Sequence, residues 1–185
     1  MKMKSLKITF ISIFVSTLCF LGSINLAFSQ DIESEYTISS GDIISITVFN
    51  EPDLSLEQVR LGSNGTISMP LLGQVEVAAL TVVEVESKLT ALYLDGYLKK
   101  PRVSVGIVEY RHFYINGQVQ SPGSYPYRQG LTIEKAITLA GGFTQRASRR
   151  TVLLMSEKDK DNIISVSLNH KVKPGDVITV NESFF

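Results

Sequence analysis

Residues 40–48 read Ser-Gly-Asp-Ile-Ile-Ser-Ile-Thr-Val, and residues 174–180 read Pro-Gly-Asp-Val-Ile-Thr-Val. Each stretch places Gly and Asp directly before a β-branched run. Gly accepts a positive φ and Asp bonds its own backbone, so both stretches predict a turn that leads into a strand. In the first, Ile44, Ile46 and Val48 share one face, which predicts one buried side. Two instances do not establish a repeat, and we assign Asp42 and Asp176 to turn formation rather than to acid–base catalysis.

Two helices are predicted between these strands. The first begins at Thr81, which forms a capping box with Glu84. Its expected buried face consists of Val85, Leu89 and Leu92. The second covers about residues 132–140, and its expected buried face consists of Ile133, Ala136, Ile137 and Ala140. Strands intermixed with single helices at this spacing predict an α+β fold.

Gly and Pro residues mark the remaining turns. Asn64-Gly65 predicts a hairpin in which residues 66–69 return antiparallel to residues 59–61. Pro122 and Gly123 occupy the second and third positions of an expected type II turn. The full set of predicted turn residues is Gly41, Asp42, Gly65, Pro70, Gly117, Pro122, Gly123, Gly141, Gly142, Gly175 and Asp176.

The N-terminus resembles a secretory leader. Three lysines precede an uncharged, mostly apolar run, and Ala27-Phe28-Ser29 fits an A-x-A-like cleavage site. We therefore expect residues 1–29 to be removed. Cys19 lies within the apolar run and follows Leu18 rather than a small residue, which does not favour lipidation.

Composition excludes some classes of partner. All 18 Asp and Glu residues, but only 15 of the 18 Lys and Arg residues, lie after residue 29, so that part has a net charge of −3. No basic face for nucleic acid is predicted. No cysteine lies after residue 29, so that part can form neither a disulfide nor a thiolate metal site.

No catalytic or metal-binding pattern stands out. His112 and His170 lack the neighbours of a zinc site, and we predict neither metal nor cofactor. Glu51 and Asp53 flank Pro52 in one loop, where two carboxylates seldom face each other across a substrate. We expect a protein that is not an enzyme.

An aromatic and basic surface is the candidate contact site. Aromatic rings stack on sugars, although strands are rich in aromatics for structural reasons too. We expect Phe113 and Ile115 in the core. The candidates for a glycan or subunit surface are Tyr114, Tyr125, Tyr127, Arg146, Arg149 and Arg150, of which the arginines are expected in a solvated loop after the second helix.

The ordered motifs resemble the outer-membrane polysaccharide export family. The first part carries Tyr-Thr-Ile at 36–38 before Ser-Gly-Asp at 40–42, Val-Phe-Asn-Glu-Pro-Asp-Leu at 48–54, Asn-Gly-Thr-Ile-Ser-Met-Pro-Leu-Leu-Gly at 64–73, Leu-Thr at 80–81 and Pro-Arg-Val-Ser-Val at 101–105. The second part, which resembles the soluble-ligand-binding β-grasp (SLBB) domain, carries Ile-Asn-Gly-Gln-Val at 115–119, Pro-Gly-Ser-Tyr at 122–125, Leu-Ala-Gly-Gly-Phe at 139–143 and Val-Lys-Pro-Gly-Asp-Val at 172–177.

The resemblance implies a division into a leader (1–29), a polysaccharide export N-terminal domain (30–109) and an SLBB domain (110–185). It also implies export of capsular or exopolysaccharide, with the protein in the periplasm at the outer membrane. Larger members form lipid-anchored rings with C-terminal amphipathic helices. Because neither feature is recognised here, we expect a short form whose outer-membrane passage comes from a separate protein.

The expected partners are polysaccharide, further copies of the chain and an inner-membrane protein that regulates chain length. Two alternatives remain open at this point. One is a periplasmic module that binds a glycan or another soluble ligand without forming a conduit. The other is a glycan-modifying hydrolase, which the missing catalytic pattern disfavours.

Overall fold

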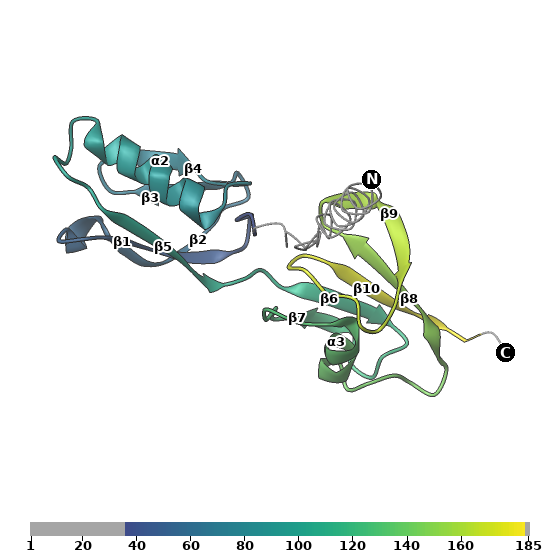
Figure 1. The fold of residues 1–185 in the computed structure, drawn as a ribbon. Helices are drawn as coiled ribbons and strands as arrows, with labels where there is room; N and C mark the ends of the chain where they lie inside the picture. The colour runs from purple at the N-terminus through teal and green to yellow at the C-terminus, as the bar shows by residue number, and fades with distance from the viewer. Residues whose placement is uncertain (1–35, 184–185) are drawn as a thin grey trace, which may run out of the picture. The chain divides into compact units, whose positions relative to one another are not determined.

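The computed structural model describes residues 36–183, which belong to one compact unit that begins at Tyr36. The predicted leader and Cys19 lie outside the described residues. Two hydrophobic clusters form separate cores, one in residues 36–109 (the first module) and one in residues 110–183 (the second module). Helices and sheets are intermixed in both modules, so the fold is α+β (Figure 1).

The first module is built around strand β1 (Ile43–Val48). It pairs antiparallel with β2 (Leu56–Arg60) on one side and with β5 (Val103–Glu109) on the other. A short 3-10 helix, η1 (Pro52–Leu54), joins β1 to β2. The predicted alternation in β1 is confirmed, since Ile44, Ile46 and Val48 are buried.

Helix α2 (Val82–Leu94) packs on this core. The predicted capping box is present: the Thr81 hydroxyl accepts from the Glu84 N–H, and the Glu84 carboxylate accepts from the Thr81 N–H at 2.7 Å. The predicted buried face is partly wrong, because Tyr93 rather than Leu92 follows Val85 and Leu89 into the core. The i+8 position lies only about 80° from the first residue of the face, so both choices fit the helical period.

The hairpin predicted at Asn64-Gly65 is wrong. Strand β3 (Thr66–Met69) pairs with β4 (Gly73–Glu76) in a separate two-stranded sheet, whereas β2 pairs with β1. Residues 62–65 do turn the chain, but the hairpin connection is residues 70–72. Leu71 in this connection has a φ of 67°, and Gly73, the first residue of β4, has a φ of 71°. Although β2 is an edge strand of its sheet, β3 pairs with the next strand along the chain, so the local turn signal did not decide the partner of β3.

The second module is a β-grasp. Its strands are β6 (Phe113–Gly117), β7 (Gly123–Tyr125), β8 (Ala147–Ser156), β9 (Asp159–Val166) and β10 (Val177–Glu182). The sheet order is β7-β6-β10-β8-β9, with β6 and β10 parallel at the centre. Helix α3 (Ile133–Leu139) has the predicted buried face, made of Ile133, Ala136, Ile137 and the following Ala140.

Two local predictions in this module are wrong. Gly123 is the first residue of β7 and is not among the glycines with positive φ, so residues 121–124 do not form a type II turn. Gly117, at the end of β6, instead takes the left-handed conformation, with a φ of 82°. The arginines Arg149 and Arg150 lie within β8 rather than in a loop, because β8 begins at Ala147.

Candidate functional site

The two Gly-Asp turns that the sequence singles out lie on either side of Arg111. Both aspartates are buried, with 0% of Asp42 and 2% of Asp176 exposed. Each carboxylate accepts a hydrogen bond at 2.8 Å from the backbone N–H three residues earlier, Ser39 for Asp42 and Lys173 for Asp176. The aspartates therefore close their own turns, as Asp commonly does.

Arg111 lies close to both turns. A Cβ built on Gly41 would lie 3.4 Å from the Arg111 Cβ, and one built on Gly175 would lie 3.0 Å from the Arg111 Nε. The Gly175 Cβ would also overlap the carboxylate of Glu157. Gly175 also has a φ of 85°, a left-handed conformation that favours glycine. The backbone and the lack of space for a Cβ therefore both favour glycine at this position.

The Arg111 side chain joins a network of buried polar groups. Its guanidinium pairs with Asp42 at 3.3 Å and with Glu157, which follows β8. It also donates to the Tyr36 hydroxyl at 2.6 Å, and that hydroxyl donates to Asp42 at 2.6 Å. Because Asp42 belongs to the first module and Glu157 to the second, Arg111 is bonded to both.

Burial is the largest cause of two pKa shifts near Arg111. Burial, followed by the hydrogen bond to Asp42, raises the pKa of the Tyr36 phenol far above its usual value. Burial also raises the pKa of Asp176, against the opposing effects of the Lys173 N–H and nearby cations. The Tyr36 ring packs edge-on against Tyr110 with centroids 4.9 Å apart, and Tyr110 packs in the same way against Tyr127 at 5.3 Å. The network bonds residues of the first module to residues of the second.

The three candidate tyrosines do not form one surface. Tyr114 is 49% exposed on the face of the sheet opposite to α3. Tyr125 lies on the other face, where its ring is 6.0 Å from that of buried Phe113 and its hydroxyl donates to the Ser121 carbonyl. Tyr127 also packs against the second core. Side chains alternate between the two faces of a sheet, so Tyr114 and Tyr125 lie on opposite faces although both were assigned to one surface from the sequence.

The candidate arginines are spread along the start of β8. Arg146 forms an ion pair with Glu182 of β10, and the Arg149 guanidinium lies 5.9 Å above the ring of Phe143. Arg150 is exposed. All three arginines are exposed, and Arg146 and Arg149 contact different partners.

The described residues offer no metal centre. Within residues 36–183, no group of three or more His, Cys, Asp or Glu side chains is placed to hold an ion. His112 instead contacts Ser124 at 2.9 Å and Glu109 at 3.5 Å. None of the helices in that range combines the length and apolar character needed to span a bilayer.

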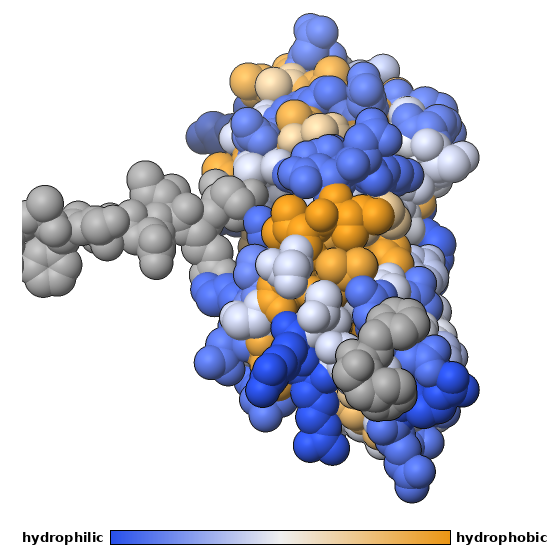
Figure 2. Space-filling view, turned by 90° about the vertical axis from the view of Figure 1, so that its right-hand side faces the viewer, coloured by the Kyte–Doolittle hydropathy of each residue, from blue (hydrophilic) through white to orange (hydrophobic). Residues whose placement is uncertain are grey.

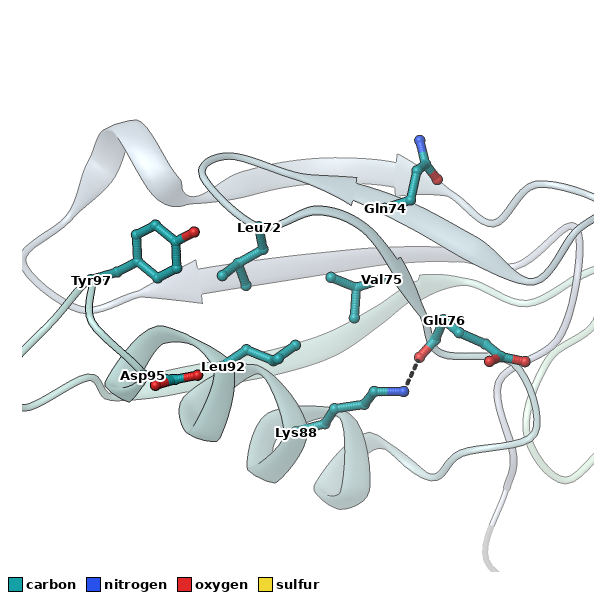
Figure 3. A pocket seen from close by; sticks show the side chains of 8 residues that line it. All are labelled: Leu72, Gln74, Val75, Glu76, Lys88, Leu92, Asp95 and Tyr97. Carbon is teal, nitrogen blue, oxygen red and sulfur yellow. Dashed lines mark hydrogen bonds between the residues drawn. The ribbon is translucent and has the colours of Figure 1, made fainter.

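Sequence reasoning missed a groove in the first module. It lies between β4 and α2, has a volume of about 480 Å³, and is shown in Figure 3. Its lining residues are Leu72, Gln74, Val75, Glu76, Lys88, Leu92, Asp95 and Tyr97. The signals available in the sequence were Leu92 and Tyr97, apolar or aromatic residues at and beyond the end of the predicted helix, but nothing local placed β4 opposite to them.

Comparison with known proteins identifies both modules. Residues 30–108 match the family model of polysaccharide biosynthesis/export proteins, and residues 112–164 match that of the SLBB domain. Together the two matches support placing the chain in the polysaccharide export family, with an SLBB domain after the export domain.

Two curated relatives carry names that agree with this family. The exopolysaccharide production protein ExoF of Rhizobium meliloti is 37% identical over 84 residues, which cover 44% of this chain and 20% of ExoF. The EPS I polysaccharide export outer membrane protein EpsA of Ralstonia solanacearum is 26% identical over 170 residues, which cover 77% of this chain and 45% of EpsA. The chain therefore spans 20% of the length of ExoF and 45% of the length of EpsA.

Proposed function

We propose that this chain is a non-enzymatic component that passes exopolysaccharide from the periplasm across the outer membrane. The observation that carries the proposal is the presence, in one chain, of an export domain followed by an SLBB domain. The printed names of ExoF and EpsA, which refer to exopolysaccharide production and export, support it.

Deletion of the gene tests this proposal. We expect exopolysaccharide on the cell surface to fall sharply and to return when the wild-type gene is supplied on a plasmid. Intracellular and periplasmic polymer should be measured in parallel, because a loss of synthesis would lower all three pools. Surface polymer that is unchanged by deletion would refute the export role and would leave the periplasmic ligand-binding module as the better reading.

The proposal includes a periplasmic location after removal of residues 1–29. Mass spectrometry of protein from the periplasm should find an N-terminus at or near Gln30. An intact Met1, or a lipid on Cys19, would contradict it.

A non-enzymatic role also predicts that no carboxylate pair acts as a glycosidase. Substituting Glu51→Gln together with Asp53→Asn should leave glycan turnover at background, as in the wild type. Cleavage by the wild type that disappears in this double variant would show that the chain is an enzyme.

We further propose that copies of the chain assemble and that an inner-membrane chain-length protein contacts them. The three-stranded sheet of the first module has the edge strands β2 and β5, and the five-stranded sheet of the second has the edge strands β7 and β9. Proteins commonly pair or cover such edges. Strand β9 carries two exposed apolar residues, Ile163 (59% exposed) and Ile164 (44% exposed). Figure 2, which views the molecule from the right-hand side of Figure 1, shows a hydrophobic patch bordered by hydrophilic side chains.

Light scattering over a concentration series and crosslinking in cells test the assembly, and a strict monomer in both would refute it.

A further inference from the structure

The groove between β4 and α2 has an apolar floor. In Figure 3, Leu72 and Val75 project from the β3–β4 hairpin toward α2, and Leu92 projects from α2 toward them. Val75 is only 4% exposed, whereas Leu92 is 37% exposed. The volume of about 480 Å³ lies within the range of small-ligand sites, which is about 300–1,000 Å³.

The walls of the groove are held in place by contacts beneath them. Tyr93, which follows Leu92 in α2 and is fully buried, donates its hydroxyl to the Pro70 carbonyl at 3.1 Å, which ties the helix to the hairpin connection. Farther along, the Lys88 ammonium donates to the Glu76 backbone carbonyl at 2.7 Å. A ligand would therefore meet a groove that is already formed and would lose little free energy in ordering it.

Polar and aromatic groups stand at the two ends of the floor. Tyr97 and Asp95 follow the last turn of α2, and Lys88 and Glu76 lie toward the opposite end (Figure 3). Tyr97 is 51% exposed, so half of its surface is not used by the core. A pyranose ring needs an aromatic or apolar face for its C–H side and hydrogen-bond acceptors for its hydroxyls, and Tyr97, Leu92 and the Asp95 carboxylate supply these groups.

The charge of the lining selects among sugars. Glu76 and Asp95 contribute two negative charges, and Lys88 contributes the single positive charge. The Lys88 ammonium already donates to the Glu76 backbone carbonyl. A uronate or another acidic sugar would meet net repulsion here, whereas an uncharged ring would not.

We propose that this groove binds an uncharged pyranose unit of a polysaccharide chain. The inference rests on the proposed function only for the presence of such a polymer near the protein. One shallow groove with a single aromatic platform gives weak binding, which suits a polymer that must move on rather than stay bound.

The test is a titration of the purified ¹⁵N-labelled protein, followed by amide chemical shifts. The probes are cellotetraose and maltotetraose, which are uncharged, and tetragalacturonate, which has the same number of rings but carries carboxylates. We expect the amides of residues 92–97 to shift with an uncharged probe and not with tetragalacturonate. Tyr97→Ala should weaken binding by about three- to tenfold, the worth of one aromatic contact, and Tyr97→Phe should retain it. Phe49→Ala, which removes an aromatic side chain of equal exposure (51%) that does not line the groove, should leave binding unchanged.

Several results would overturn the inference. These are an absence of shifts at residues 92–97 with both uncharged probes, equal or tighter binding of tetragalacturonate, and an unaltered affinity in Tyr97→Ala. Shifts at these residues that follow protein concentration without any sugar would instead identify the groove as a contact between copies of the chain. If the wild-type gene restores export to the deletion strain but no uncharged probe binds, the inference fails and the export role stands. If deletion leaves export unchanged, the export role fails independently.

Discussion

Replacing Arg111 by Met should destabilise the protein by about 2–3 kcal/mol. Only 12% of the Arg111 side chain is exposed, and its partner Asp42 is fully buried. Removing one member of a buried ion pair usually costs about 3–5 kcal/mol, because a charge is left without compensation. Methionine keeps most of the apolar stem of the side chain, so the lost contribution is mainly that of the guanidinium.

Two features of the site reduce this cost. Asp42 keeps three other donors, namely the Ser39 N–H at 2.8 Å, the Tyr36 hydroxyl at 2.6 Å and the backbone N–H of residue 111 at 2.8 Å. The second partner, Glu157, is 36% exposed and can be solvated when the cation is removed. Its share of the loss should be below about 1 kcal/mol, as for other exposed pairs.

Urea unfolding followed by far-ultraviolet circular dichroism measures the change. The matched control is Arg60→Met, because exposed Arg60 also contacts the first Gly-Asp turn, through one hydrogen bond to the Gly41 carbonyl at 3.0 Å. We expect the control to lose less than about 1 kcal/mol. In a double-mutant cycle, Asp42→Asn and Arg111→Met should be coupled by about 1–2 kcal/mol. Equal losses in Arg111→Met and Arg60→Met, or a coupling near zero, would refute the assignment of the Arg111–Asp42 pair as a stabilising buried contact.

Two further predictions concern the same region and the centre of the β-grasp. The raised pKa of Tyr36 means that its phenol stays protonated in the folded state while it ionises in the unfolded state above pH 10.0, its ordinary value. The unfolding free energy should therefore be unaffected by this group below that pH and fall by up to about 1.36 kcal/mol per pH unit above it. Tyr36→Phe should remove this part of the slope, and an identical slope in both proteins would contradict the burial of the phenol. Gly117→Ala should cost more than about 3 kcal/mol, because φ is 82° and the added Cβ would overlap the Val180 carbonyl oxygen. Gly130→Ala, with a φ of 77° and no atom within 4 Å of the added Cβ, should cost only about 1–2 kcal/mol in the same urea assay.

Local patterns in the sequence were sufficient to predict several elements. The alternation of Ile44, Ile46 and Val48 marked β1, and the pairing of Thr81 with Glu84 marked the start of α2. The periodicity of residues 133–140 marked α3 and its buried face. These features depend on backbone period and on groups within four residues of each other, so neighbouring residues contain the information.

The partners of these elements were decided only by the tertiary structure. Strand β3 pairs with β4 rather than with β2, although β2 is an edge strand, so the turn at residues 62–65 does not set the partner of β3. The groove exists only because that pairing sets Val75 opposite Leu92. Arg111 bonds to Asp42 across 69 positions of sequence and to Glu157 across 46, a convergence that no local pattern encodes. Residues 39–42 and 173–176 were sufficient to predict the turns that contain Asp42 and Asp176, whereas the position of both turns beside Arg111 is a property of the folded chain, because only long-range packing brings them there.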